Sequence, residues 1–369
     1  MSGPQPRPGI LKSPAYVGGA SKAQKAVRTI KLSSNECALG ASPKGMAAYA
    51  TVTENLHRYP DGGAVELRAA LAAKYGIEAG RIVCGDGSDE ILYLLTRAYV
   101  GEGEEVLFSQ HGFVVYRLAS LGAGATPMTA AEVEHRTDVD AMLAAVTDKT
   151  RIVYLTNPNA TGTYIPASEV QRLHEGLRDD ILMVIDAAYA EYVTAADYNA
   201  GLELARGADN VVVTRTFSKA YGLAGVRLGW CYGSDAVVDV LNRLRGPFNV
   251  TLPAQVAGIA ALGDDEFLAD VVAHNETWRA WLVDALQGLG YNNIVPSVTN
   301  FILLGFADAA QADAAIAFMA DRGVLVRDLR AYGLGEYVRI TVGLEDECRA
   351  VVETLTEFRA GLATVSRGE

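Results

Sequence analysis

The sequence lacks the features of a secreted, membrane-spanning or metal-binding protein. Its four cysteines, Cys37, Cys84, Cys231 and Cys348, are scattered, with no Cys-x-x-Cys pair and no histidine–cysteine cluster at metal-ligand spacing, so we expect reduced thiols and no metal site. No apolar run reaches the roughly 20 residues that a membrane helix needs. The proline-rich N-terminus is unlike a signal peptide. Together these absences favour a cytoplasmic protein.

Positive charge is also scarce. The chain has 32 lysines and arginines against 44 aspartates and glutamates, a net charge of −12. A nucleic acid or an anionic membrane needs a basic face to meet its phosphates, so neither partner is expected. Half of the 369 residues are hydrophobic, which is ample for a folded core. We expect an N-terminal arm with part of a small domain at 1–40, a large domain at 41–250 and a small α+β domain at 251–369.

Short apolar runs alternate with longer amphipathic stretches from about residue 81 to residue 230. Each run is closed by polar or glycine-rich residues, and several are apolar at every position, as expected of strands covered on both faces. We therefore predict an α/β fold with a large, doubly wound, mostly parallel sheet. The expected strands are Arg81–Cys84, Glu105–Phe108, Arg151–Leu155, Ile181–Ile185, Val211–Thr214 and Gly225–Tyr232.

Helical periodicity fills the segments between and after these strands. Beyond a break at Arg245-Gly246-Pro247, a long helix and an alternation of strands and a helix predict the smaller α+β unit. Further helices are expected near 40–60 and 235–260. The named expectations are helices at Asp89–Val100, Val139–Val146, Ala167–Arg178, Asp264–Leu289 and Ala309–Arg322, and strands at Phe301–Leu304 and Tyr337–Val342.

Chemically active residues follow the expected strands. In an open α/β sheet, ligands bind beyond the carboxyl ends of the strands. Asp186 ends one strand, with Tyr189 three residues on; Asn159 follows a second, and Lys219 a third. A lysine amine can form an imine with an aldehyde cofactor, and pyridoxal phosphate is such an aldehyde. Asp186 then suits the pyridine nitrogen, while Asn159 and Tyr189 can donate to the ring's phenolic oxygen.

A phosphate cradle is expected at Gly85–Glu90, where a strand ends and a helix begins. The backbone N–H groups of Gly87, Ser88 and Asp89 would point at the phosphate. The segment lacks the third glycine of a dinucleotide fingerprint and has no Gly-Lys-Ser/Thr, so neither NAD nor a nucleoside triphosphate is favoured. A cation at Arg227 and hydroxyls at Thr216 and Ser218 can complete the cradle.

Six short segments occur in a fixed order along nearly the whole chain. They are Leu32–Glu36, His57–Gly62, Gly87–Glu90, Asp186–Tyr189, Thr216–Gly225 and Val338–Gly343. Together they resemble the fold-type-I aminotransferases, which use pyridoxal phosphate, and the resemblance is closest to the histidinol-phosphate aminotransferases. It implies a ping-pong transamination between histidinol phosphate and 2-oxoglutarate in histidine biosynthesis.

The resemblance also implies roles for further residues. Phe113 would stack on the pyridine ring, and Tyr59 would reach the cofactor phosphate of a second subunit, which implies a homodimer with shared active sites. Arg339 would bind an acidic group of the substrate and Arg327 its phosphate. Residues of the N-terminal arm and of the cofactor site would also contact the substrate. The implied substrate-binding residues are Arg339, Arg327, Tyr16, Asn35, Tyr59 and Asn159.

The chain departs from this family in two places. Cys37-Ala38 replaces the usual Asn-Pro, and Asn159-Ala160-Thr161-Gly162 lacks a proline and is one residue shorter than the usual loop. We choose Asn159 over Asn157 for the ring contact because it directly precedes the Ala-Thr-Gly remnant. Three alternatives stay open: an aromatic (Phe/Tyr) or dual-specificity aminotransferase, a related decarboxylase or oxidase, and a non-catalytic pyridoxal-phosphate-binding regulator. The last would normally carry a basic DNA-binding appendage, and the sequence shows none.

Overall fold

The computed structural model describes residues 3–4, 6–7, 9–12, 15, 18–22 and 28–365. The chain divides into two compact units, each described here by itself. Unit 1 comprises Met1–Ala15, Ala41–Ala160 and Tyr164–Leu268, and unit 2 comprises Tyr16–Gly40, Thr161–Thr163 and Ala269–Glu369. The expected domain boundaries after residues 40 and 250 stay predictions.

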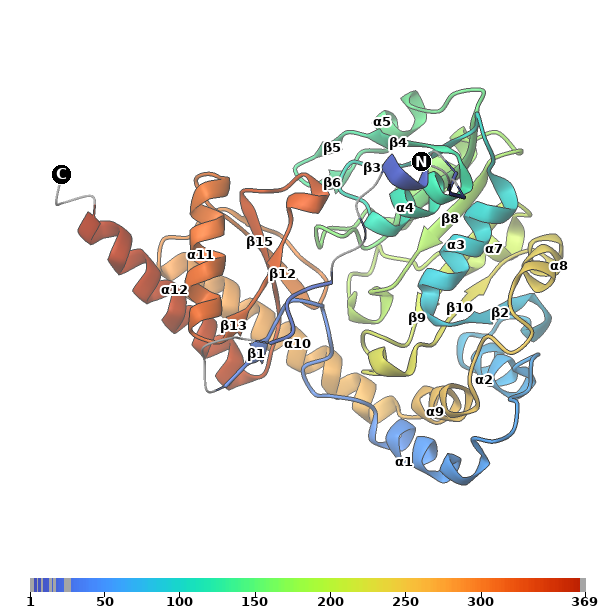
Figure 1. Ribbon diagram of the computed structural model, residues 1–369, viewed down its shortest axis with the longest axis horizontal. Helices are drawn as coiled ribbons and strands as arrows, with labels where there is room; N and C mark the ends of the chain where they lie inside the picture. The colour runs from blue at the N-terminus through green and yellow to red at the C-terminus, as the bar shows by residue number, and fades with distance from the viewer. Residues whose placement is uncertain are drawn as a thin grey trace. The chain divides into compact units, whose positions relative to one another are not determined.

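Unit 1 is built on a seven-stranded sheet (Figure 1). Only β10 runs against its neighbours, so the sheet is mixed and mostly parallel. This confirms the α/β fold predicted from the apolar runs. In spatial order the strands are β2 (Ile82–Gly85), β10 (Gly229–Tyr232), β9 (Val211–Thr216), β8 (Leu182–Asp186), β7 (Thr150–Thr156), β3 (Glu105–Ser109) and β4 (Thr126–Ala130).

Helices cover both faces of this sheet, because alternate strand residues point to opposite sides and both sets are apolar. Val184 packs with the helices of one face and Ile185 with those of the other. The first face carries α3 (Gly87–Tyr99), α4 (Val114–Ala123) and α8 (Asp235–Leu244). The second carries α2 (Val65–Tyr75), α5 (Val139–Ala144), α6 (Ala167–Gly176), α7 (Leu202–Gly207) and α9 (Leu252–Leu262), and α1 (Pro43–Thr51) packs on α9.

Unit 2 has a four-stranded antiparallel sheet packed against helices. Its core joins Ile302, Val338 and Ile340 of the sheet to Leu282 and Leu355 of the helices. The sheet order is β11 (Ile294–Val295), β12 (Phe301–Gly305), β15 (Tyr337–Thr341) and β14 (Arg327–Asp328); the helices are α10 (Asp265–Gly288, which begins in unit 1), α11 (Ala309–Asp321) and α12 (Glu345–Val365). A two-stranded parallel pair joins β1 (Ile30–Lys31) to β13 (Val324–Leu325).

The remaining elements are short. A hairpin joins β5 (Glu132–Val133) to β6 (Arg136–Thr137), and the 3₁₀ helices are η1 (Ile10–Lys12), η2 (Thr53–Asn55), η3 (Ala79–Arg81), η4 (Ala190–Tyr192), η5 (Ala224–Val226) and η6 (Arg330–Tyr332). The strand expected from Gly225 begins only at Gly229, because η5 and a left-handed Arg227 at φ 57° occupy the residues before it. In the described part of the chain, no helix is long and apolar enough to span a membrane.

Candidate functional site

The carboxyl ends of the strands of unit 1 meet at one edge of the sheet. Gly229 of β10 stands opposite both Gly85 at the end of β2 and Thr216 at the end of β9, so β2 and β9 run in the same direction. Strands β8 and β7 run parallel to β9, with Asp186 beside Thr156. The residues that follow these strands are therefore brought to one place, as predicted for an α/β sheet.

Asp186 is a buried carboxylate with neutral hydrogen-bond donors. It is 3% exposed; Tyr116 Oη donates to its Oδ2 at 2.7 Å and Thr214 Oγ1 to its Oδ1 at 3.1 Å. Burial raises the pKa of the Asp186 carboxyl from its ordinary value of 3.8 to about 6, against the opposing effect of these donors. A buried carboxylate without an ion pair is the partner that a cationic ring nitrogen requires.

Lys219 and Tyr189 lie next to each other. The Nζ of Lys219 is 5.7 Å from the centre of the Tyr189 ring. Tyr189 follows β8 and precedes η4, whereas Lys219 lies three residues beyond β9. Neighbouring parallel strands thus deliver an amine and a phenol to the same place.

A buried ion pair joins the two segments that carry this amine and phenol. Arg215 Nη2 donates to Glu191 Oε1 at 2.7 Å, with side chains 5% and 7% exposed. Glu191 lies two residues after Tyr189, and Arg215 four residues before Lys219. The pair therefore ties the Tyr189 segment to the end of β9.

The N-terminus of α3 lies against the guanidinium of Arg227. Gly87 has φ 74°, and a Cβ there would lie 2.2 Å from Nη2 of Arg227, so the guanidinium lies directly against the turn. Arg227 donates to Ser218 Oγ at 3.3 Å, and Ser218 N donates to Thr216 Oγ1 at 3.1 Å. The carboxylates nearest to Arg227 are loose partners, with Asp89 at 3.7 Å. The helix N-terminus, the hydroxyls and the guanidinium thus lie together, and these are the groups that bind anions in proteins.

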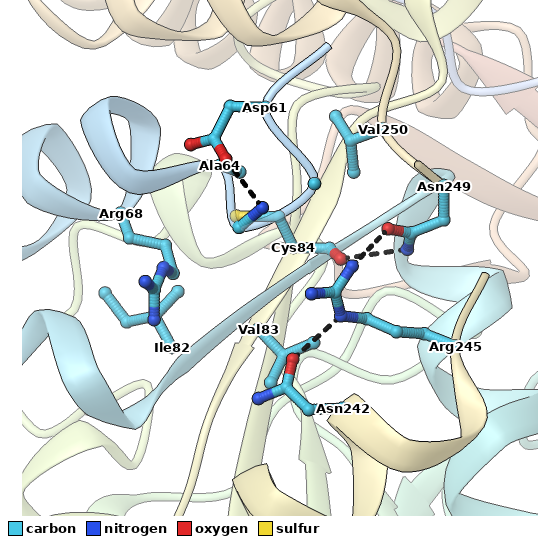
Figure 2. Close-up of a pocket in the computed structure, with 12 residues that line it drawn as sticks. Asp61, Ala64, Arg68, Ile82, Val83, Cys84, Asn242, Arg245, Asn249 and Val250 are labelled. Carbon is cyan, nitrogen blue, oxygen red and sulfur yellow. Dashed lines mark hydrogen bonds between the residues drawn. The ribbon is translucent and has the colours of Figure 1, made fainter. Parts of the chain in front are cut away.

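A polar cavity of about 100 Å³ is lined by residues of β2 and of the segments around Asp61 and Arg245 (Figure 2). Asn249 donates to the carbonyl of Cys84 at 3.1 Å and to Glu90 Oε2 at 2.8 Å, and Arg245 donates to Asn249 Oδ1 at 3.1 Å. Glu90 Oε2 also accepts from the backbone N of Asp86 at 2.6 Å. These hydrogen bonds fix the conformation of the Gly85–Glu90 turn.

The two asparagines of the β7 loop have different surroundings. The side chain of Asn157 is engaged by the backbone of Ile165, donating to its oxygen at 3.1 Å and accepting from its nitrogen at 3.0 Å. Asn159 donates from Nδ2 to Glu132 Oε1 at 2.8 Å. Phe113, half-buried at the start of α4, meets Tyr116 edge-on at 5.9 Å between ring centres, next to Asp186. Asn157 thus has a structural role, which favours Asn159 for the ring contact.

Unit 2 brings together two arginines and Asn35. Arg327 and Arg339 are opposite each other in the β14–β15 pair, and each is only 8% exposed. Arg339 lies 5.0 Å from the centre of the Phe301 ring, and its Nε is buried with no hydrogen-bond partner among the described residues. Asn35 accepts a hydrogen bond from Oγ1 of Thr341 at 3.2 Å. Thr341 lies two residues after Arg339 on β15. Two neighbouring buried cations favour an anion between them.

No contact among the described residues joins Tyr59 to these groups. Tyr59 is 81% exposed and stacks on Phe248, with ring centres 4.5 Å apart. Tyr16 lies outside the described residues. Within the described part of the chain, no group of three or more histidine, cysteine, aspartate or glutamate side chains is placed to hold a metal ion.

Sequence reasoning missed Tyr116, Thr214, Glu132 and the Arg215–Glu191 pair. Thr214 and Arg215 lie in β9, at and just after the end of the predicted strand, so the sequence indicates their closeness to Lys219 but not their contacts. In the sequence, Tyr116 has the pattern of an ordinary core aromatic residue of an amphipathic helix. Its contact with Asp186 joins residues 70 positions apart, and no local pattern predicts it.

Comparison with known proteins identifies the family. Residues 27–355 match the aminotransferase class I and II family. The chain belongs to this family. It is 53% identical over 361 residues, covering 97% of this chain and 99% of the relative, to a histidinol-phosphate aminotransferase of Paramagnetospirillum magneticum. It is 50% identical to the histidinol-phosphate aminotransferase of Rhodospirillum centenum, covering 98% of this chain and all of the relative.

Solved structures give the same fold. The histidinol-phosphate aminotransferase of Sinorhizobium meliloti, crystallised in complex with pyridoxal-5'-phosphate, matches with a TM-score of 0.86 at 28% identity, and the match covers 92% of each chain. An aspartate aminotransferase of Thermus thermophilus matches with a TM-score of 0.80 at 19% identity, covering 89% of this chain and 95% of the other, which supports the fold alone.

Proposed function

We propose that this chain is a pyridoxal-phosphate-dependent aminotransferase that transfers the amino group of L-histidinol phosphate to 2-oxoglutarate, giving imidazole-acetol phosphate and glutamate in histidine biosynthesis. The observation that carries the proposal is the identity of about half of the residues, over nearly the full length of both chains, with relatives that bear this name. The two buried arginines of unit 2 suit a phosphorylated substrate.

The residues of unit 1 fit pyridoxal phosphate. Asp186, buried with neutral donors, suits the protonated ring nitrogen. The N-terminus of α3, Ser218 and Arg227 suit the phosphate, and the close approach of Arg227 to Gly87 leaves no room for a side chain there. The bound cofactor supplies an electron sink for the bond that breaks at the substrate Cα.

The chain's own residues hold the reactants and move the proton. Lys219 Nζ would hold the cofactor covalently, and its free amine would take the proton from the substrate Cα. Tyr189 and Asn159 would donate to the phenolic oxygen, and Phe113 would stack on the ring and exclude water from one face. Oγ1 of Thr216 accepts a hydrogen bond from the backbone N–H of Ser218. This contact orients Ser218, whose hydroxyl we propose binds the phosphate.

The substrate is held by unit 2. Arg339 and Arg327 bind its acidic groups, Arg327 the phosphate, because a planar guanidinium pairs with two oxygens at once. Asn35, Asn159, Tyr16 and Tyr59 complete the proposed substrate set. Arg327 is therefore the residue that distinguishes histidinol phosphate from an aromatic amino acid.

We further propose a cytoplasmic homodimer with shared active sites. Exposed apolar side chains on unit 1 support a subunit interface, namely Met46, Tyr49, Leu56, Tyr59 and Phe248. Coexpression of a Tyr59→Ala chain with a Lys219→Ala chain tests it. Half of the dimers are then hybrids with one intact site in two, so we expect about a quarter of the wild-type activity. Activity no higher than that of either parent contradicts shared sites.

An absorbance titration of the cofactor-loaded protein tests the substrate. We expect histidinol phosphate to convert the cofactor to its pyridoxamine form at a far lower concentration than phenylalanine. Arg327→Gln should raise the histidinol phosphate requirement roughly 10- to 100-fold, since a charge-assisted contact is lost, and affect phenylalanine much less. Arg322→Gln, at a half-exposed arginine, is the control. Preference for phenylalanine indicates an aromatic aminotransferase, and no visible cofactor band contradicts the role of Lys219.

A further inference from the structure

A carboxylate from a remote hairpin contacts Asn159. Glu132, on β5, accepts from Asn159 Nδ2 at 2.8 Å and from the backbone N of His111 at 3.2 Å, both at Oε1. Its second oxygen, Oε2, is buried and has no hydrogen-bond partner within the described residues. The contact joins residues 27 positions apart. Because a buried carboxylate oxygen without a partner is costly, this glutamate needs an explanation other than packing.

The amide of Asn159 is fixed on both sides. Its Oδ1 accepts from the backbone N of Ala160 at 2.8 Å, and its Nδ2 donates to Glu132. An amide group is planar and carries two N–H bonds at fixed angles on one nitrogen. With the oxygen and one N–H engaged, the direction of the remaining N–H is set. Asn159 is 1% exposed, so the side chain has little freedom to turn.

We propose that Glu132 is a positioning residue that aims the second Nδ2–H of Asn159 at the phenolic oxygen of the cofactor. This inference rests on the proposed function, in which Asn159 is the donor to that oxygen. Glu132 itself touches neither cofactor nor substrate. Without it, Asn159 keeps only the contact with Ala160 and loses the acceptor that fixes its NH₂ group.

The hairpin is a stable support for this role. Glu132 pairs in register with Thr137, and the two tip residues, Glu134 and His135, are in the left-handed conformation at φ 51° and 62°, as two-residue hairpin turns require. The ring of His135 lies 6.0 Å from that of His111, whose backbone N also binds Glu132. The loop after β3 and the hairpin are thus held together at the carboxylate that holds Asn159.

The test separates positioning from charge. Glu132→Gln and Glu132→Met both remove the negative charge, but only glutamine keeps an acceptor for Asn159 Nδ2. The measured quantity is the pH midpoint of the visible absorbance transition of the cofactor-loaded protein without substrate. A donor at the phenolic oxygen lowers this midpoint. We expect the Glu132→Met midpoint to lie at least about 0.5 pH unit above that of Glu132→Gln, and Glu134→Gln, the same change at an exposed neighbour, to match the wild type.

The same comparison in an Asn159→Ala background completes the experiment. There the difference between the methionine and glutamine variants should vanish, because no amide remains to be positioned. Two results would overturn the role of Glu132 but leave the assignment of Asn159 intact. One is equal midpoints of the Glu132→Met and Glu132→Gln variants when Asn159 is present, and the other is a difference that persists in Asn159→Ala. If Asn159→Ala leaves the wild-type midpoint unchanged, the assignment of Asn159 fails, and this proposal with it. Glu132→Ala replaces Glu132→Met if that variant does not fold.

Discussion

Replacing Asp186 by asparagine should stabilise the cofactor-free protein. The buried carboxyl has its pKa raised to about 6 from an ordinary 3.8, and burial is the cause. That difference corresponds to roughly 3 kcal/mol of folding free energy lost when the group is ionised. Asparagine has the same shape and no charge, and the hydroxyls of Tyr116 and Thr214 can still bond to it. Allowing about 1 kcal/mol for weaker hydrogen bonds, we expect a gain of about 2 kcal/mol above pH 7.

The pH dependence gives the sign of this effect. Because the pKa of Asp186 is higher in the folded state, the folded protein holds the proton more tightly than the unfolded chain does. The penalty is therefore complete above about pH 7, shrinks as the pH falls through 6, and is absent below the unfolded value near 4. The advantage of Asp186→Asn should be large at pH 8 and small at pH 5.

Thermal unfolding of cofactor-free protein at the two pH values measures this effect. At roughly 1 to 1.5 °C per kcal/mol for a chain of this length, the variant should melt about 2 to 3 °C higher at pH 8. Asp148→Asn, which removes a charge from an exposed position, is the matched control and should melt like the wild type. Adding pyridoxal phosphate should reverse the order, because only the aspartate pairs with the ring cation. A variant no more stable than the wild type at pH 8, or equally favoured at pH 5, would refute the reasoning.

Three other changes test separate parts of the site. Arg215→Met should cost about 3 to 5 kcal/mol, since it leaves Glu191 buried and unpaired, and denaturant unfolding should show a smaller loss when Glu191→Leu is added. Gly87→Ala should weaken cofactor affinity at least roughly tenfold in a fluorescence titration, because its Cβ displaces Arg227 and φ 74° strains alanine; equal affinity would contradict the cradle. Arg339→Lys should lower kcat/KM for histidinol phosphate roughly 100-fold in steady-state assays, whereas a tenfold or smaller change would mean that a point charge suffices.

The sequence carried most of the information about unit 1. Strands buried on both faces read as continuous apolar runs, so β7, β8 and β9 were found to within one or two residues, and the polar residues at their ends followed. β4, by contrast, was missed. Its sequence, Thr126-Pro127-Met128-Thr129-Ala130, is partly exposed at the edge of the sheet, so no buried run marks it.

The contacts that support the site were not predictable in the same way. Glu132 faces Asn159 because a hairpin turns at Glu134-His135, a pair that lacks the glycine or asparagine by which such turns are recognised. The start of β10 was placed four residues early, since a Gly-rich stretch does not show whether it forms a strand or the η5 turn. Each miss depends on a tertiary contact or a backbone angle, neither of which residue types determine locally.

Some charged side chains of unit 1 form a close ion pair and others do not. This difference supports the proposed site. Arg215 and Glu191 are similarly buried and form an ion pair at 2.7 Å. Among the described residues, Asp186 is just as buried but has neutral donors, and the nearest carboxylates of Arg227 lie at 3.7 and 4.0 Å. Burying the Asp186 carboxylate without an ion pair is costly, whereas the half-exposed Arg227 can accept a further anion. Asp186 therefore suits a cation and Arg227 an anion, as we propose for the protonated ring nitrogen and the phosphate of pyridoxal phosphate.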